Sequence, residues 1–158
     1  IAFWTTTFFG HVYNSTVWGT YALSAYWTGM ILGRFLASVF PKKGISFLKK
    51  GTIMTCASTV LALLIKSKVV GFVSFFFIGL GFSVAWPIII SITSDKFHIY
   101  KGTAVGIMMS LGAMGGTVFP FLVGIFDSYG RIKVAFWTIP ILAAIMLFAI
   151  LRSERMKA

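Results

Sequence analysis

The sequence contains very little acidic charge. Only 3 of its 158 residues are Asp or Glu, against 14 Lys and Arg, and charged residues make up 11% of the chain. An ordinary soluble domain has about 25% charged residues, so this chain cannot cover itself with a charged surface. The acidic residues Asp95, Asp127 and Glu154 lie at the ends of apolar runs or in the C-terminal tail. Because no carboxylate lies deep in an apolar run, we expect no acid–base pair and no enzyme activity.

Cysteine and histidine are also scarce. The one cysteine, Cys56, cannot form an internal disulfide, and the two histidines, His11 and His98, are far apart in the sequence. No Cys/His cluster has the spacing of metal ligands, so we expect no metal site and no cofactor. The chain begins inside an apolar run, and we expect it to be part of a longer protein.

Apolar residues dominate what is present. They make up 58% of the chain, 17% of residues are aromatic, and the mean hydropathy is +0.94. A membrane-spanning helix needs roughly 20 mostly apolar residues. The pattern predicts an all-α membrane protein whose single unit, residues 1–158, has a short turn at 21–24 and six transmembrane helices: 1–20, 25–40, 52–65, 69–93, 102–126 and 132–151.

The basic residues indicate an orientation. Ten of them lie on the side of the 41–50 loop, the 94–101 connector and the tail, and four lie on the other side. Cytoplasmic loops carry an excess of Lys and Arg, so we expect both termini in the cytoplasm of a multi-pass protein of the plasma or cell membrane. The net charge of +11 then reflects topology and the lipid bilayer, and we expect no nucleic-acid partner.

The six predicted helices form two triplets of opposite topology. Inverted three-helix repeats of this kind recur in secondary transporters. The expected fold is therefore six transmembrane helices arranged as two inverted three-helix repeats.

Small residues recur at helical spacing in three of the apolar segments. Close helix approach is predicted where such stripes lie in a membrane. The stripes are Gly29 and Gly33; Gly79, Ser83, Pro87 and Ser91; Gly102, Gly106 and Ser110; and Gly112, Gly116, Pro120 and Gly124. Gly112 and Gly116 are expected to lie on a surface that repacks when a cavity opens.

Arg34 follows the first glycine pair at the predicted cytoplasmic end of its helix. A carboxylate from a neighbouring helix would hold it there, and Asp95 is the candidate. The alternative, that Arg34 only extends to the interface as a topology signal, stays open.

The first segment carries His11, Asn14, Ser15 and Trp18, which are candidates for substrate binding. In a continuous helix His11 would lie near the middle of the membrane, where a polar group is a functional hypothesis by default. Asn14 and Ser15 would share its face at spacings of three and four. No acidic partner of His11 is expected. The alternative is a structural hydrogen-bond cluster between helices.

Trp86 and Pro87 form a second candidate site. Proline frees the carbonyl of Ser83 and bends the helix, and free carbonyls at membrane depth are tolerated where they line a cavity. Trp86 could stack on a sugar or another flat ligand, or it could pack against lipid or a neighbouring helix.

Three stretches resemble parts of the Major Facilitator Superfamily. GMILGRFLASVFPKKG resembles the signature loop between helices eight and nine, GLGFSVAWP resembles helix ten, and GTAVGIMMSLGAMGGTVFPFLVGIFDSYG resembles helix eleven and its exit. Trp18 and Tyr21 match a W-x-x-Y pattern of the fucose–galactose–glucose:proton symporter branch. The resemblance implies helices seven to twelve of this fold, with a missing N-terminal six-helix half as partner.

The resemblance also implies a function. It predicts a secondary active transporter that moves a small polar solute, with a sugar as the leading substrate, by alternating access. The first, second, fourth and fifth segments would line the cavity, and a proton or a sodium ion could be the coupling ion. A carrier of organic acids or drug-like compounds, and a non-transporting membrane scaffold or receptor on the same fold, remain as alternatives.

Overall fold

The computed structural model describes residues 1–39 and 44–155, and all regular structure in these ranges is helical. The all-α class is therefore confirmed. The predicted loop residues Pro41–Lys43 and the end of the tail lie outside the described residues. The elements are η1 (Ala2–Trp4), α1 (Thr5–Tyr13), α2 (Thr16–Val39), α3 (Gly44–Leu64), α4 (Lys68–Phe82), α5 (Ala85–Lys96), α6 (Lys101–Ser128), α7 (Ile132–Phe136) and α8 (Thr138–Arg155).

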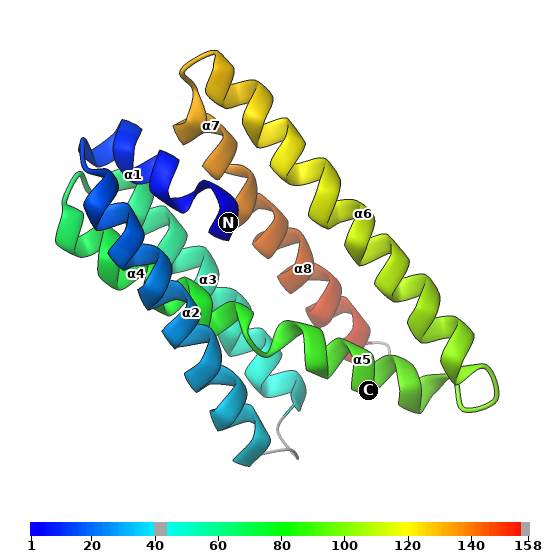
Figure 1. The fold of residues 1–158 in the computed structure, drawn as a ribbon. Helices are drawn as coiled ribbons and strands as arrows, with labels where there is room; N and C mark the ends of the chain where they lie inside the picture. Colours follow the sequence, from blue (N-terminus) through cyan, green and yellow to red (C-terminus); the bar gives the residue numbers. More distant parts are fainter. Residues whose placement is uncertain (40–43, 156–158) are drawn as a thin grey trace.

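Two of the helical segments are interrupted just before a proline (Figure 1). Pro87 is the third residue of α5, after the break between α4 and α5, and Pro140 is the third residue of α8, after the break at Trp137. Proline cannot donate an amide hydrogen bond and its ring clashes with the carbonyl four residues earlier, so the helix restarts with proline in its first turn. The bend predicted from Pro87 is confirmed. Pro120, by contrast, lies inside an unbroken α6.

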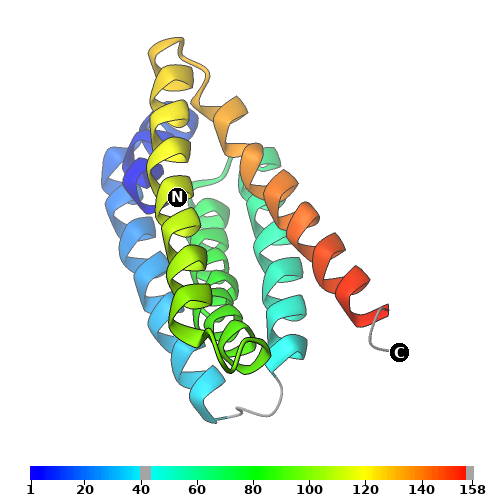
Figure 2. The same ribbon diagram turned by 90° about the vertical axis from the view of Figure 1, so that its right-hand side faces the viewer.

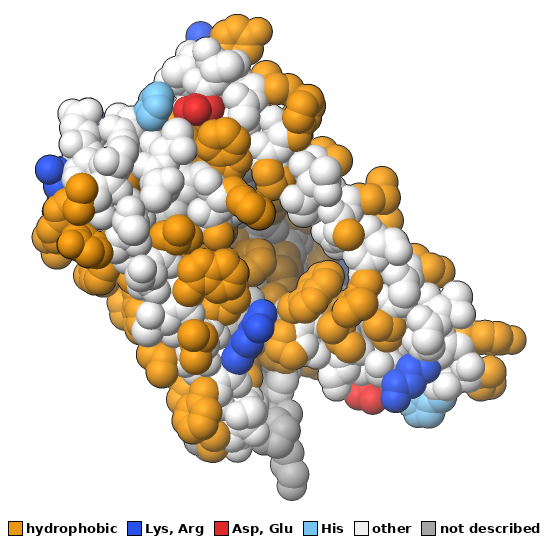
Figure 3. Space-filling view, viewed as in Figure 1, with side chains coloured by type: hydrophobic (Ala, Val, Ile, Leu, Met, Phe, Trp, Pro, Cys, Tyr) orange, Lys and Arg blue, Asp and Glu red, His pale blue; other side chains and the backbone are white. Residues whose placement is uncertain are grey.

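Four segments of the described chain are long and apolar enough to cross a membrane. They are Gly44–Leu64, Lys68–Lys96, Lys101–Ser128 and Ile132–Arg152. Apolar side chains also cover much of the outer surface (Figure 3). Such a surface is unusual for a monomer in water and fits a multi-pass membrane protein.

The first hairpin differs from its prediction. Tyr21–Ser24, the predicted turn, is helical within α2, and the helix instead ends at Asn14, which has a left-handed φ of 52°. The amides of Asn14 and Ser15 both donate to the carbonyl of Phe9. Asparagine tolerates this conformation better than most residues. The predicted boundaries 1–20 and 25–40 are therefore wrong, and α1 is too short to cross a membrane alone.

Helices α2 and α4 pack backbone to backbone. A Cβ added to Gly29 would overlap the carbonyl oxygen of Phe76, and one added to Gly33 would overlap the hydroxyl of Ser83. From the other side, Gly79 meets the carbonyl of Tyr26 in the same way. The close approach predicted from these glycines is confirmed, and it joins α2 and α4 through direct backbone contact.

An aromatic cluster fixes α1 on the bundle. Phe8 is fully buried and stacks on Phe136 of α7 with ring centroids 4.2 Å apart, and it also lies 5.9 Å from Phe75 of α4. The hydroxyl of Tyr13 donates to the carbonyl of Ala62 on α3. The short α1 is thus held by three other helices.

Helix α6 lies along one side of the bundle and buries none of its residues (Figure 2). A Cβ added to Gly102, Gly106 or Gly116 would meet no described atom within 4 Å. The close packing predicted for this glycine stripe is therefore wrong along most of α6. The physical reason is that two tryptophan rings, Trp86 at Gly112 and Trp4 at Gly124, lie between α6 and the bundle.

Candidate functional site

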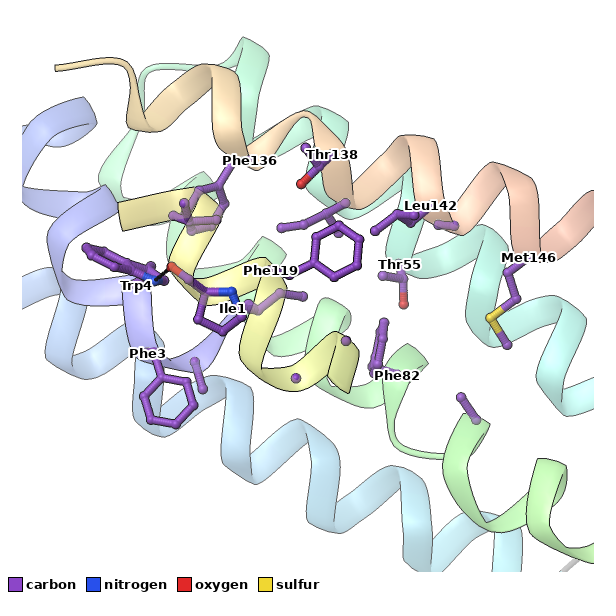
Figure 4. Close-up of a pocket in the computed structure, with 18 of the residues that line it drawn as sticks. Ile1, Phe3, Trp4, Thr55, Phe82, Phe119, Phe136, Thr138, Leu142 and Met146 are labelled. Carbon is purple, nitrogen blue, oxygen red and sulfur yellow. Dashed lines mark hydrogen bonds between the residues drawn. The ribbon is translucent and has the colours of Figure 1, made fainter. Parts of the chain in front are cut away.

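A cavity of about 500 Å³ lies between α6 and the rest of the bundle (Figures 3 and 4). We call it the central cavity. Its walls come from η1, α3, α4, α6, α7 and α8, with one residue each from α2 and α5. Pockets that bind small molecules commonly measure roughly 300–1,000 Å³, so the space is of ligand size.

Most of the cavity wall is aromatic or aliphatic. The close-up shows Phe119 of α6, Phe136 of α7 and Phe82 of α4 around the same space, with Leu142 and Met146 of α8 along one side (Figure 4). These rings and chains come from four helices. The cavity can therefore hold an apolar body of substantial area.

The wall formed by α6 is made partly of glycine. Gly112, Gly115 and Gly116 line the cavity, and a Cβ on Gly116 would meet no described atom within 4 Å. Glycine here leaves the space open because there is no side chain to fill it. Any larger residue at Gly116 would project into unoccupied volume.

Thr55 is the polar feature of this cavity. Its side chain is 1% exposed, and its hydroxyl oxygen has no hydrogen-bond partner among the described residues. By contrast, the hydroxyls of Thr52 and Thr138, which also line the cavity, donate to the carbonyls of Leu48 at 2.7 Å and Ala135 at 2.6 Å. Leaving a buried polar group unpaired costs about 1–3 kcal/mol, so Thr55 is able to gain from a ligand.

Two tryptophans set the width of the cavity. The indole N–H of Trp4 donates to the carbonyl of Pro120 on α6 at 3.2 Å. Near the other end, the Trp86 ring lies against Gly112. These two rings therefore lie between α6 and the bundle and help to set its distance.

The predicted substrate residues do not gather at this cavity. None of His11, Asn14, Ser15, Trp18, Ser83 and Trp86 lines it, although the predicted conformational residues Gly112 and Gly116 do. The predicted helices 52–65 and 132–151, expected outside the cavity, contribute Thr55 and Leu142 to its wall. The expectation that only the first, second, fourth and fifth segments line the cavity is therefore wrong for the central cavity.

His11 has an acidic partner, contrary to the prediction. Its Nε2 lies 3.8 Å from Oδ1 of Asp127, and the two side chains are 50% and 21% exposed. The contact joins the last turn of α1 to the end of α6. The sequence separation of the two residues hides this pair, which forms only because α6 and α7 return the chain to α1.

Removal of this pair is expected to loosen the contact between α1 and α6. We expect Asp127→Asn to lower the free energy of unfolding, by less than about 1 kcal/mol because the pair is partly exposed. Thermal unfolding in detergent measures the loss, with Asp95→Asn as the control. Equal unfolding midpoints for Asp127→Asn and Asp95→Asn would contradict the pairing.

Asn14 and Ser15 form the turn between α1 and α2. The Ser15 hydroxyl accepts a hydrogen bond from the amide of Trp18 at 3.5 Å, as a helix N-cap does. The expectation that both residues share a helical face with His11 is wrong, because the helix ends before them. Trp18 instead lies edge-on to Phe72 of α4, with ring centroids 6.2 Å apart.

Ser83 and Trp86 lie on either side of the α4–α5 break. The Ser83 hydroxyl is buried and donates to the carbonyl of Leu80 at 2.6 Å. Trp86 and Pro87 line a second, more open hollow that also includes Arg34. Ser83 lines neither this hollow nor the central cavity, so Ser83 and Trp86 do not form one site.

Arg34 and Asp95 are not joined by an ion pair in the part of the chain that the structure describes. Asp95 accepts a weak hydrogen bond from the Ser91 hydroxyl at 3.5 Å, within its own helix. The predicted pairing is therefore absent here, and the alternative of Arg34 as a topology signal is favoured.

The sequence did carry one overlooked signal for the cavity. Thr52, Thr55 and Thr59 recur at spacings of three and four in an otherwise apolar helix, which places them on one face. The aromatic wall residues gave no such signal, because aromatic residues occur throughout the chain.

Comparison with known proteins identifies no relative. No protein-family model matches the chain, and neither a curated protein nor a solved structure matches it. The likeness to the Major Facilitator Superfamily therefore remains a prediction from the residues quoted above.

Proposed function

We propose that this chain is part of a multi-pass membrane transporter that moves a small solute by alternating access. The single observation that carries the proposal is the cavity of about 500 Å³ between α6 and the bundle. It lies among segments that are long and apolar enough to cross a membrane. A ligand-sized space inside a membrane bundle is the basic requirement of a carrier.

The contacts of α6 also support the proposal that this helix moves during transport and forms a movable wall of the central cavity. Its residues are all at least partly exposed, and the Trp4–Pro120 hydrogen bond and the Trp86–Gly112 contact join it to the bundle across the cavity. A helix held by few contacts can move at low cost compared with α2, whose backbone touches α4. We therefore assign α6 the moving part and the α2–α4 pair the rigid part.

The remaining parts of the proposal come from the resemblance. They are membership of the Major Facilitator Superfamily as helices seven to twelve, a sugar as cargo, coupling to a proton or sodium ion, and a second six-helix half as partner. The cytoplasmic location of both termini rests on the distribution of Lys and Arg.

Uptake into proteoliposomes tests the proposed function. The full-length protein is reconstituted and the uptake of labelled hexoses, organic acids and aromatic solutes is measured with and without a pH or sodium gradient. We expect gradient-dependent accumulation of at least one solute above that in protein-free liposomes. Absence of flux for every solute would overturn the transporter and favour the membrane scaffold.

A further inference from the structure

We infer that the central cavity binds a small aromatic compound that carries a single hydrogen-bonding group, with Thr55 as its polar anchor. The inference rests on the proposed function and specifies the substrate class of the same site. It differs from the hexose expected from the resemblance.

The shape and chemistry of the wall favour an aromatic body. Phe82, Phe119 and Phe136 face the space from three helices, and the α6 glycines that line it add no side chains to its wall. Aromatic side chains attract flat rings through edge-to-face and offset contacts beyond the burial of apolar area. An acyl chain would gain the burial but not these contacts.

The number of free polar groups limits the ligand further. Among the described residues, the buried hydroxyl of Thr55 has no partner, whereas those of Thr52 and Thr138 already donate to backbone carbonyls. A hexose would bury five hydroxyls in a mostly apolar space, and each unpaired hydroxyl is costly. A compound with one hydroxyl or amine matches the donor and acceptor capacity of Thr55.

Thr55 is well placed for this role. In Figure 4 its side chain extends from α3 toward Phe82, into the region enclosed by the labelled residues. Its neighbour across the helix contact is Gly81 of α4, where an added Cβ would lie 2.5 Å from the Thr55 hydroxyl. Glycine at this position therefore lets α4 pack directly beside the Thr55 hydroxyl without a clash.

Binding of a matched pair of probes tests the inference. Labelled 2-naphthol and naphthalene, which differ by one hydroxyl, are equilibrated with the full-length protein in lipid nanodiscs, and empty nanodiscs give the lipid background. We expect saturable binding of 2-naphthol, about tenfold weaker in Thr55→Val, with naphthalene binding unchanged by that variant. Thr59→Val is the matched control, because Thr59 is equally buried on α3, bonds to the Thr55 carbonyl and does not line the cavity.

The outcomes separate this inference from the proposed function. Displacement of 2-naphthol by glucose or oleate at lower concentration than by unlabelled 2-naphthol would overturn the aromatic ligand in favour of a sugar or a lipid chain. Equal affinity of Thr55→Val and the parent would overturn the anchor. Binding of 2-naphthol without flux of any solute would contradict the proposed transport function but support the aromatic site. Flux of a hexose without binding of 2-naphthol would support transport but contradict the aromatic site.

Discussion

Replacement of Gly33 by alanine is expected to lower the free energy of unfolding by about 1–3 kcal/mol, the usual cost of an overpacked core. The added methyl group would overlap the Ser83 hydroxyl and approach the carbonyl of Leu80 at 2.6 Å. Because the second contact is with backbone, it cannot be relieved by a rotation of a side chain. Gly29→Ala should act in the same way through the carbonyl of Phe76.

A control for this prediction lies on α6. Gly106 has no described atom within 4 Å of an added Cβ, so Gly106→Ala should raise helix stability by up to about 1 kcal/mol. Thermal unfolding in detergent, followed by a thiol-reactive dye at the free and only partly exposed Cys56, measures all three variants. A stability of Gly33→Ala equal to that of Gly106→Ala would contradict the backbone contact of α2 and α4.

Replacement of Gly112 by leucine is expected to reduce transport by at least tenfold while membrane insertion stays intact. The new side chain would occupy the place of the Trp86 ring and push α6 away from the bundle. Gly116→Leu should also impair transport, for another reason: it projects into free space and fills the central cavity. A tenfold loss corresponds to about 1.4 kcal/mol, well within the cost of an altered packing contact.

The matched control is Gly106→Leu. This glycine lies on the same helix and has open space beside it, and it does not line the central cavity. Flux per inserted protein in proteoliposomes compares the three variants, with insertion checked by protease protection. Unchanged flux in both Gly112→Leu and Gly116→Leu would show that the glycine stripe of α6 has no part in transport.

The helix breaks show how far local rules reach. Pro87 predicts an interruption in its own turn, and the structure has one there, because the rule depends only on a missing amide hydrogen and a ring clash. The break at Asn14 was missed, since asparagine permits a left-handed residue without requiring it. The turn between the first two helices therefore comes about two helical turns earlier in the chain than predicted. As a consequence, His11 and Ser15 do not share a helical face.

The glycines also show which features a local pattern predicts and which depend on tertiary packing. Gly29 and Gly33 lie on a predicted contact surface that the structure fills with α4, whereas Gly102, Gly106 and Gly116 of α6 face open space. A stripe of small residues allows close approach but does not state which helix approaches. That choice depends on the Trp4 and Trp86 rings, which hold α6 at a distance.

By itself, the sequence determined the helical class, four of the six predicted membrane segments and the break at Pro87, because hydropathy and backbone geometry act over a few neighbouring residues. Only the tertiary structure decided that His11 meets Asp127, that Thr55 is buried with no partner in the described part of the chain, and that α6 helps to enclose a cavity. These features join residues from different helices, and their contacts depend on how whole helices pack, which no local pattern specifies.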